Sequence, residues 1–347
     1  MMSYKAQYQA KFRTPEDAVK CVKSGDWVDY GAVLSQPVAL DKALAARKAE
    51  LADVKIRAVL AMRPREVIEC DPAREHFTYC TWYMGGYERK MYNQGRCDYI
   101  PLLLRNLPLF YRRELTPDVA MIATAPMDNE GYFNFSMSAF ANKAVIEKAK
   151  IVIIEENKYM PYANGTGQEH RVHITDVDFI VRGDYPLTVL PSAPPDDDDK
   201  KAAAFIVEEI KNGSTIQLGI GGMPNAVGQM IADSDLKELG MHTEMLVDAY
   251  LQMHRRGKLT NLSKNIDKGL GVWAFGAGSQ DLYDWVEGNS SLSLHPTNYV
   301  NDPYIMAHLD NFVSVNNCLE VDLFGQVSSE SSGYRHISGT GGQLDFV

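Results

Sequence analysis

Residues 211–228 read KNGSTIQLGIGGMPNAVG, in which a strand-like run, Ser214–Leu218, leads at once into a glycine-rich turn, Gly219–Gly228. Glycine reaches backbone conformations that other residues avoid, and such a turn leaves main-chain N–H groups free and lets another molecule approach closely. The stretch therefore predicts the strand and turn of an α/β unit that can hold a ligand. An ordinary connection between a strand and a helix has the same local pattern, so the turn alone does not decide between the two.

The first part of the chain carries a second copy of this pattern. KSGDWVDYG at 23–31 matches KNGSTIQLG at 211–219 in its lysine, its two glycines and one aliphatic position. Each copy then reaches a proline and an alanine, Pro37 and Ala39 in one and Pro224 and Ala226 in the other. A further match, in the same order, joins Val119–Gly131 to Val313–Gly325. Two ordered matches predict two tandem halves of similar fold.

Strand-like and helical stretches alternate along the chain. Apolar runs occupy Lys55–Ala61, Val119–Ala123 and Ile151–Glu155, and a helical stretch rich in Ala and Lys, Ser138–Ala149, separates the last two. This alternation predicts an α/β fold with a mostly parallel sheet in each half.

The expected boundary between the halves is PSAPPDDDDK at 191–200. Prolines and consecutive aspartates cannot join a core, so this stretch is predicted to be a solvated linker that caps the following helix. We therefore expect an N-terminal domain at 1–190 and a C-terminal domain at 201–347. The last residues, GGQLDFV, have the pattern of a turn followed by the start of a strand, so we expect a further C-terminal part to be missing from this half.

Composition excludes several classes of partner. The 347 residues carry a net charge of −10, with 45% hydrophobic and 23% charged residues, which is typical of a soluble globular protein of two domains. No basic stripe is present to neutralise phosphates, so nucleic acid is not expected as a partner, whereas a small anionic ligand is compatible with the composition. No signal peptide and no apolar run of membrane-spanning length is present, so we expect a cytoplasmic protein without a membrane partner.

Residues that suggest a metal or disulfide site are poorly spaced for either. The five cysteines are scattered and contain no Cys-x-x-Cys, which predicts buried free thiols. His170 and His173 lack acidic partners at a recognisable spacing, so no metal site is expected. The aromatic residues around Trp82 and Tyr83 are predicted to belong to the core or to an interface, and an acyl-chain pocket is the alternative for them.

The sequence HTEM at 242–245 places one carboxylate, Glu244, among apolar neighbours. A carboxylate near a cluster of free N–H groups predicts acyl chemistry, with a nucleophile and with donors for the oxyanion that it creates. A solvated surface carboxylate is the alternative for Glu244 alone. The double glycine at 221–222 has no counterpart in the first half, which reads AVLSQP at 32–37. We therefore expect one active site per chain, on the second half.

Two nucleotide-binding patterns fit this turn badly. GIGGMP at 219–224 differs from the dinucleotide fingerprint Gly-x-Gly-x-x-Gly, because Pro224 lacks an N–H and no acidic residue is placed for a ribose. A P-loop is excluded because no Gly-Lys-Ser/Thr follows. A third glycine cluster, SGTGGQ at 338–343, is either a flexible tip or a turn that closes over a phosphate-bearing ligand.

Taken together, these motifs resemble those of the family I CoA-transferases over essentially the whole chain. The segments that carry the resemblance are Ser24–Gly31, Ala125–Asp128, Gly131–Phe135, Leu218–Gly228, His242–Met245, Phe275–Gly278 and Ser338–Phe346. Long motifs in this order are far more specific than any single glycine turn. Chains of this family usually continue beyond the equivalent of residue 347, which agrees with the expectation of a missing C-terminal part.

The resemblance implies a role for each matching residue. Glu244 is implied as the nucleophile, and the backbone of Gly221, Gly222 and Met223 as the oxyanion donors. The implied CoA contacts are Gly219, Phe275, Gly276, Ala277, Gly278, Asn301, Gly339, Gly341, Gly342 and Gln343. No metal and no permanently bound cofactor is implied, because CoA arrives as part of the substrate.

The implied activity is transfer of CoA from a short-chain acyl-CoA, butyryl-CoA above all, to a carboxylic acid such as acetate, by a ping-pong reaction through a glutamyl-CoA thioester. A homodimer or homotetramer, acting in butyrate metabolism and fermentation, is implied as well. The alternatives are an acyl-CoA hydrolase and a 4-hydroxybutyrate CoA-transferase on the same fold. The apolar run Leu246–Tyr250, where 4-hydroxybutyrate members have Ser-Asp-Gly, favours an unsubstituted acyl chain.

Overall fold

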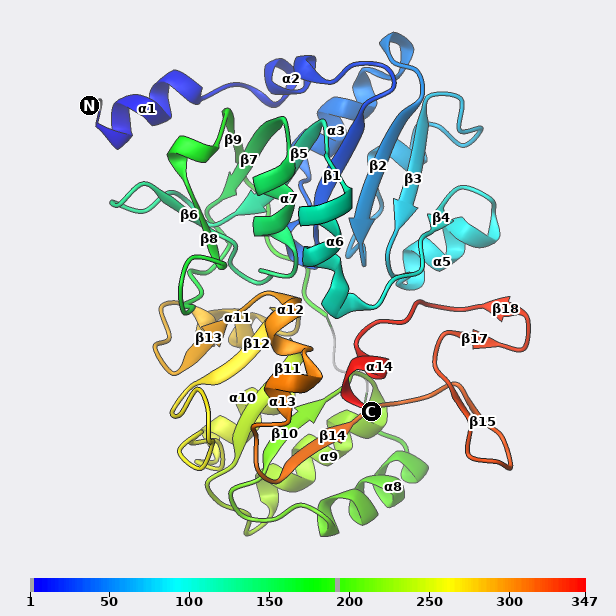
Figure 1. Cartoon of the computed structure of the whole chain (residues 1–347), viewed down its shortest axis with the longest axis vertical. Coiled ribbons are helices and arrows are strands. Elements are labelled where there is room, and N and C mark those ends of the chain that lie inside the picture. Colours follow the sequence, from blue (N-terminus) through cyan, green and yellow to red (C-terminus); the bar gives the residue numbers. More distant parts are fainter. Residues whose placement is uncertain (1–2, 191–193) are drawn as a thin grey trace.

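The protein consists of two α/β halves stacked on one another, as described by a computed structural model for residues 3–190 and 194–347 (Figure 1). The first half contains a seven-stranded sheet with the order β4-β3-β2-β1-β5-β7-β9, and the second half a five-stranded sheet with the order β13-β12-β11-β10-β14. All neighbouring strands in both sheets are parallel. The predicted α/β class with parallel sheets is therefore confirmed.

The strands of the first sheet are β1 (Trp27–Ala32), β2 (Val54–Val59), β3 (Phe77–Thr81), β4 (Asp98–Tyr99), β5 (Val119–Thr124), β7 (Ile151–Asn157) and β9 (Phe179–Gly183). The strands of the second sheet are β10 (Thr215–Leu218), β11 (Gly240–Leu246), β12 (Gly271–Gly276), β13 (Leu292–Leu294) and β14 (Phe312–Val315). A small antiparallel pair, β6 (Tyr132–Asn134) and β8 (Arg171–His173), flanks the first sheet.

The two sheets repeat the same topology. In the first, β1 lies between β2 and β5, and β3 and β4 follow β2; in the second, β10 lies between β11 and β14, and β12 and β13 follow β11. The two sequence matches fall on equivalent strands, β1 with β10 and β5 with β14. The predicted duplication is thus visible in the strand order, and only the first sheet extends further, through β7 and β9.

Helices cover both faces of the first sheet, so its strands are apolar on both sides, as is usual for parallel sheets. Every residue of β5 is buried: Val119 and Met121 join one core, and Ala120 and Ile122 join another. The first core includes residues of α2 (Pro15–Ala18), α3 (Ala39–Ala46) and α4 (Glu66–Glu69), and the second includes residues of α6 (Leu107–Glu114) and α7 (Asn142–Lys148).

The remaining helices of the first half are α1 (Tyr4–Lys11) and α5 (Gly86–Asn93), and short 3₁₀ turns lie at Val19–Cys21, Val33–Ser35, Lys48–Glu50, Leu104–Asn106 and Ile174–Asp176. The helices of the second half are α8 (Asp197–Glu208), α9 (Gly222–Asp233), α10 (Asp248–Arg255), α11 (Gln280–Val286), α12 (Thr297–Val300), α13 (Pro303–Met306) and α14 (Gln343–Phe346). None of the helices in the described ranges is long and apolar enough to cross a bilayer.

The two halves are joined by main-chain hydrogen bonds as well as by a shared core. The segment 137–140 of the first half lies along β12 of the second, where the N–H of Gly276 donates to the carbonyl of Met137 at 2.8 Å. The N–H of Ala139 likewise donates to the carbonyl of Ala274 at 3.1 Å. One of the two cores contains residues from both sheets, so the halves pack as one body.

The region between the halves agrees only in part with the predicted linker. Residues 191–193 lie outside the described residues, but α8 already begins at Asp197, inside the stretch 191–200. The side chain of Asp196 accepts from the N–H of Asp199, and the side chain of Asp199 accepts from the N–H of Asp196, which forms a capping box. The aspartate run is therefore the N-terminal turn of a helix, while the domain limits at 190 and 201 stay a prediction.

Two local predictions were wrong. The segment after Gly342 is the helical turn α14 and not a strand, because Asp345 pairs with Arg105 and Phe346 packs near Phe312. The cysteines are free as expected, but only Cys80 and Cys97 are buried; Cys21 and Cys70 are partly exposed, and Cys318 is exposed because it lies in an extended arm outside the core.

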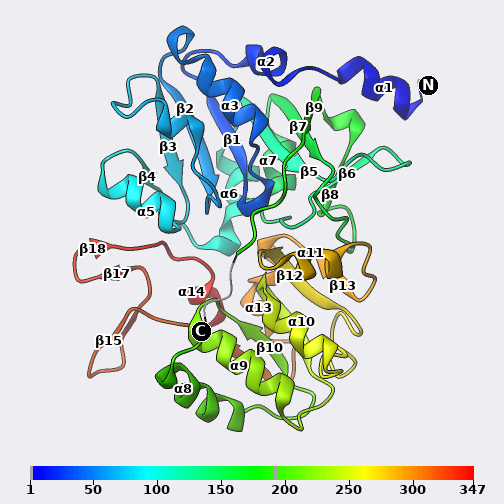
Figure 2. The same ribbon diagram turned by 180° about the vertical axis from the view of Figure 1, so that it is seen from behind.

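That arm, residues 316–338, forms two small hairpins beside the body. They are β15 (Glu320–Val321) with β16 (Val327–Ser328), and β17 (Ser331–Ser332) with β18 (Arg335–His336). Figures 1 and 2 show the arm next to α5 and leading back to α14, which lies between the two halves. His336 packs against Tyr99 with ring centroids 4.3 Å apart, which ties the arm to the first half.

We expect the buried ion pair of the first sheet to matter strongly for stability. The guanidinium of Arg57 donates to fully buried Asp29 at 2.6 Å, and both side chains are almost inaccessible. Arg57→Met should lower the free energy of unfolding in urea by about 3–5 kcal/mol, because it leaves a buried carboxylate without its counter-charge. The matched control is Arg255→Met, whose exposed pair with Asp281 should contribute less than about 1 kcal/mol. Equal losses in the two variants would contradict the expectation.

Candidate active site

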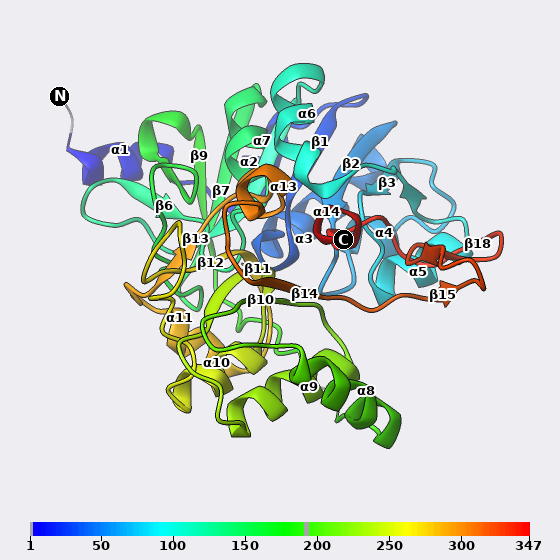
Figure 3. The same cartoon turned by 60° about the horizontal axis from the view of Figure 1, so that its bottom comes forward.

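The cavity lies where the carboxyl ends of the two parallel sheets face each other. Val33 follows β1 and Leu60 follows β2, while Gly219 follows β10 and Asn316 follows β14. Loops at the carboxyl ends of parallel strands are the usual ligand sites of α/β folds. The cavity measures about 310 Å³, and its lining includes residues of α14 and of the arm. Figure 3 shows how the arm leads back to α14.

The lining of the cavity is apolar with a polar border. The apolar side chains are Val33, Val59, Leu60, Leu104, Phe140, Leu218, Ile220, Met245, Phe275, Leu319, Ile337 and Phe346. The other lining residues are Tyr83, Arg89, Gln217, Gly219, Glu244, Asn316, Asn317, Cys318, Ser329, Ser338, Gly339, Thr340, Gly341, Gly342 and Gln343. Of these described residues, only Glu244 and Arg89 carry a formal charge, so the carboxylate of Glu244 is the one acidic group exposed to a ligand.

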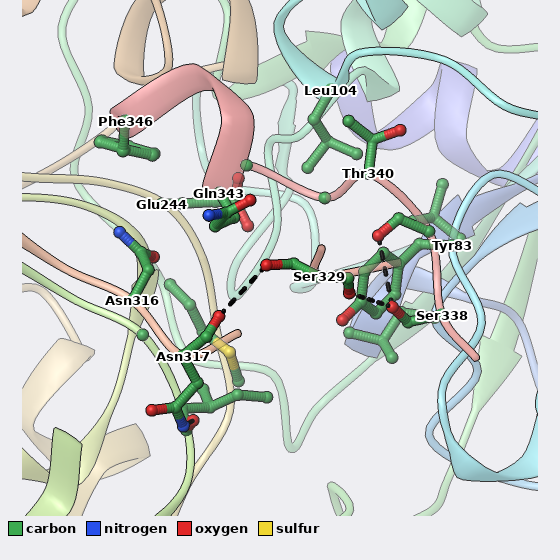
Figure 4. Close-up of a pocket in the computed structure, with 18 of the residues that line it drawn as sticks. Tyr83, Leu104, Glu244, Asn316, Asn317, Ser329, Ser338, Thr340, Gln343 and Phe346 are labelled. Atoms are coloured by element: carbon green, nitrogen blue, oxygen red, sulfur yellow. Dashed lines mark hydrogen bonds between the residues drawn. The ribbon is translucent and has the colours of Figure 1, made fainter. Parts of the chain in front are cut away.

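Strand β11 positions Glu244 with its carboxylate turned into the cavity. It is the one residue of β11 that remains partly accessible, the other six being buried, and Figure 4 shows it beside Gln343, with Tyr83 and Ser338 on the other side of the cavity. Burial raises the pKa of Glu244 to about 7; the hydrogen bond from Asn301 acts in the opposite direction, and the nearby charge of Asp345 raises the pKa further. A carboxylate with little solvent around it is a stronger nucleophile than one in water.

Asn301 holds this carboxylate from the side of α12. Its Nδ2 donates both to Oε2 of Glu244 and, at 3.1 Å, to Oδ2 of Asp345. Asp345 is in turn paired with Arg105 at 3.1 Å. The amide therefore bridges two carboxylates, and Arg105 compensates the charge of the second one.

The glycine turn that touches Glu244 is the one at 341–342. A Cβ atom on Gly342 would lie 1.7 Å from Oε2 of Glu244, so no other residue fits there without displacing the carboxylate. Gly341 has a φ of +54°, a left-handed conformation that favours glycine. On the opposite side, Cβ atoms on Gly339 and Gly341 would each lie 3.1 Å from the ring of Tyr83.

The sequence of the chain agrees with this geometry. Residues 1–191 match the acetyl-CoA hydrolase/transferase N-terminal domain, and residues 278–347 match the C-terminal domain of the same name. The chain belongs to the acetyl-CoA hydrolase/transferase family. The resemblance predicted from the motifs is thus confirmed.

Two similar members of the family are named for CoA transfer. The chain is 49% identical, over its whole length, to the butyryl-CoA:acetate CoA-transferase of Anaerostipes caccae, of which it covers 78%. It is 46% identical, over 98% of its length, to the probable butyrate:acetyl-CoA coenzyme A-transferase of Syntrophomonas wolfei, of which it covers 76%. RipA from Yersinia pestis has the same fold, with a TM-score of 0.90 at 29% identity over 99% of this chain and 79% of RipA.

The structure brings part of the predicted family site together. Gly219, Glu244, Phe275, Gly339, Gly341, Gly342 and Gln343 all line the cavity, and Asn301 contacts Glu244 directly. Gly221, Gly222, Met223, Gly276, Ala277 and Gly278 are not among the lining residues. The Gly221 turn instead faces Asn317, and a Cβ on Gly222 would lie 2.1 Å from Asp199 at the start of α8.

Several residues of the site were missed by sequence reasoning. Arg105 is 240 positions from its partner Asp345, and no local pattern marks it. Arg89 also lies in a part of the chain without a motif. The two predictions for the aromatic residues each hold for one of them. Tyr83 lines the cavity, as the acyl-pocket alternative predicted, whereas Trp82 is buried in the core.

Three bulky lining residues are held in an unusual backbone conformation. Val33, Leu60 and Phe140 have φ values of +56°, +51° and +39°. Residues with a Cβ rarely adopt such conformations, and those that do are concentrated at functional sites where the surroundings impose them.

In the two described ranges no group of His, Cys, Asp or Glu is arranged to hold a metal ion.

The raised pKa of Glu244 predicts a pH-dependent stability. Below about pH 4 the carboxyl is protonated in both folded and unfolded chains, and between this pH and 7 only the unfolded chain ionises, so stability falls as pH rises through this window. Glu244→Gln should therefore raise the free energy of unfolding, measured in urea, by up to about 3 kcal/mol at pH 8. At pH 4 the same substitution should give no gain. Exposed Glu16→Gln is the control, and a gain of Glu244→Gln that is independent of pH would contradict the shift.

Proposed function

We propose that the protein transfers CoA from butyryl-CoA to acetate, with Glu244 as the nucleophile. The observation that carries the proposal is the position of Glu244: it is the only acidic side chain among the described residues of an apolar cavity between the two halves, pressed against Gly342. The relative from Anaerostipes caccae, named for this reaction, shares 49% of its residues with the chain.

The first half of the reaction moves CoA onto the protein. The carboxylate of Glu244 attacks the thioester carbonyl, the C–S bond breaks, and CoA leaves as a thiolate while a butyryl-glutamyl anhydride forms. The thiolate then attacks the glutamyl carbonyl of this anhydride, the C–O bond breaks, and butyrate leaves. The product is a thioester between Glu244 and CoA.

The second half is the same sequence with acetate. The acetate carboxylate attacks the glutamyl-CoA thioester and expels CoA thiolate, which gives an acetyl-glutamyl anhydride. The thiolate attacks the acetyl carbonyl, so that acetyl-CoA leaves and the carboxylate of Glu244 is restored. One thioester replaces another, and no ATP, metal or bound cofactor takes part.

Each of these attacks creates a tetrahedral oxyanion that needs donors already in place. The Asn301 amide and the main chain at Gly341–Gly342 lie closest to Glu244 and suit this role. We keep the backbone of Gly221, Gly222 and Met223 as the second candidate set of donors, one that a movement of α8 away from Gly222 would make available.

The polar border of the cavity suits the pantetheine arm of CoA, which carries two amides. Gln217 and Asn316 form a reciprocal amide pair there, with Nδ2 of Asn316 donating to Oε1 of Gln217 at 2.9 Å. Phe275 and the glycine loop at 339–342 complete this side. Interactions with this non-reacting arm orient the thioester at Glu244, so that remote binding lowers the barrier to transfer.

The acyl chain fits the apolar wall supplied by the first half, chiefly Val33, Leu60 and Phe140. A hydroxyl on the chain would lose its hydration there without gaining a partner. Residues 246–250, which the sequence pointed to for this choice, are not among the lining residues, so the wall and not that run favours butyryl over 4-hydroxybutyryl substrates. A cytoplasmic homodimer or homotetramer completes the proposal.

Covalent trapping tests the chemistry. The protein incubated with butyryl-CoA and then reduced with borohydride should carry a modification at Glu244, detected by mass spectrometry of peptides. Glu244→Gln, which keeps the shape of the side chain, should show no adduct and at least about a 10³-fold lower rate of CoA transfer, as expected when the nucleophile is removed. Consumption of butyryl-CoA that acetate does not accelerate would indicate an acyl-CoA hydrolase instead.

Substrate preference tests the apolar wall. The ratio kcat/KM should be higher for butyryl-CoA than for 4-hydroxybutyryl-CoA by about tenfold or more, the usual result of burying an unpaired hydroxyl. Leu60→Ser should reduce this preference, while Leu262→Ser, on the exposed surface, is the control that should leave it unchanged. A preference of the unmodified protein for the hydroxylated substrate would overturn this part of the proposal.

A further inference from the structure

His242 lies beneath the nucleophile on the same strand. It is fully buried in β11, two positions before Glu244. Alternate residues of a strand project to the same face of the sheet, so the two side chains point to the same side. A histidine so close to a reacting carboxylate invites the interpretation that it is a general base.

The contacts of His242 do not support that role. Its Nε2 lies 2.8 Å from the carbonyl oxygen of Val300, which can only accept, so Nε2 carries the proton. Nδ1 is buried and has no hydrogen-bond partner among the described residues. Burial, and next the charge of Lys264, lower the pKa of His242 to about 4, so the ring is neutral near pH 7.

The carbonyl that His242 holds belongs to the residue before Asn301. Val300 is the last residue of α12, and Asn301 then reaches back to Glu244 with its amide. Two residues of β11 are therefore connected through the end of α12. His242 bonds to the carbonyl of Val300, the next residue is Asn301, and the side chain of Asn301 bonds to Glu244. The other end of α12 is fixed by Thr297, whose hydroxyl donates to the carbonyl of Leu104 at 3.2 Å.

We propose that His242 is a positioning residue: its Nε2–H holds the carbonyl of Val300 and thereby fixes the amide of Asn301 against the carboxylate of Glu244. The expected effect on the rate rests on the proposed function. The expected effect on the pKa of Glu244 does not, because Asn301 contacts this carboxylate whether or not CoA is transferred. A displacement of a catalytic group by about 1 Å can slow a reaction by about 10²-fold.

His242 is packed against aromatic rings, so an aromatic residue can replace it without a large change in volume. Its ring packs against Phe312 and Tyr299, with centroids 6.1 Å and 6.4 Å away. The ionisable groups that act on it are Lys264, Asp267 and His295. Around Glu244 the corresponding groups are Asp345 and the phenol of Tyr83. None of these needs to be altered in the experiment.

The test compares two substitutions. His242→Phe keeps the ring and removes the donor, whereas His242→Gln keeps an N–H at a similar reach. The pKa of Glu244, read by carbon-13 NMR of its carboxyl carbon, should rise in His242→Phe because the amide of Asn301 no longer stabilises the charged form, and should stay close to the original in His242→Gln. In CoA transfer, kcat should fall by about tenfold or more in His242→Phe with little change of KM for butyryl-CoA.

A double-mutant cycle decides whether the effect passes through Asn301. If it does, His242→Phe has no further effect on kcat or on the pKa of Glu244 once Asn301→Ala is present. The matched control is His76→Phe, which removes the same kind of bond, from His76 to the carbonyl of Leu51, far from the site. It should lower stability and leave the pKa of Glu244 unchanged.

The outcomes separate the two proposals. Full additivity of His242→Phe and Asn301→Ala, or an unchanged pKa of Glu244 in His242→Phe, would overturn the positioning role. If the unmodified protein transfers no CoA while the pKa still responds to His242→Phe and not to His242→Gln, the positioning role is supported and the proposed function is wrong.

Discussion

The contact between Gly342 and Glu244 is the constraint on which the site depends. The main chain of the turn at 341–342 lies so close to the carboxylate that a single methyl group on residue 342 would overlap it. This approach requires glycine at 342. Beside it, Asn301 lies between the carboxylates of Glu244 and Asp345, and Arg105 balances the buried charge of Asp345. Burial raises the pKa of Glu244, so holding its carboxylate at this cavity comes at a cost in stability.

The duplicated halves contribute differently to the site. Both halves place a helix after their central strand, and in the first half the N-terminus of this helix is occupied by a side chain of the protein. Fully buried Glu155 accepts hydrogen bonds from the N–H groups of Val38, Ala39 and Leu40 at 2.8–3.1 Å. A helix N-terminus that holds an internal carboxylate no longer offers its N–H groups to a ligand. The first half instead contributes an apolar wall, and its strained residues Val33, Leu60 and Phe140 are where the duplicated fold has been adapted to that task.

How far the sequence could predict this site depended on whether the relevant signal was local. Glu244 and the loop at 339–343 lie in continuous motifs, and both line the cavity. The double glycine at 221–222 has an equally clear motif, yet its turn faces Asn317 and Asp199, because the packing of α8 against α9 decides which N–H groups remain accessible. The final residues read as a strand by composition but form a helical turn, since the pairing of Asp345 with Arg105 is not visible within seven residues of sequence.

By itself, the sequence determined the α/β class, the internal duplication and the family, and it singled out Glu244 as the carboxylate to look for. Each of these rests on a periodic pattern or on residues adjacent in the chain. Only the tertiary structure decided which glycine turn meets the carboxylate, that Asn301 touches Glu244 directly, and that the first half supplies the apolar wall. These depend on distances between segments separated by tens to hundreds of residues. Such distances are set by how helices and sheets pack together, and no local pattern encodes them.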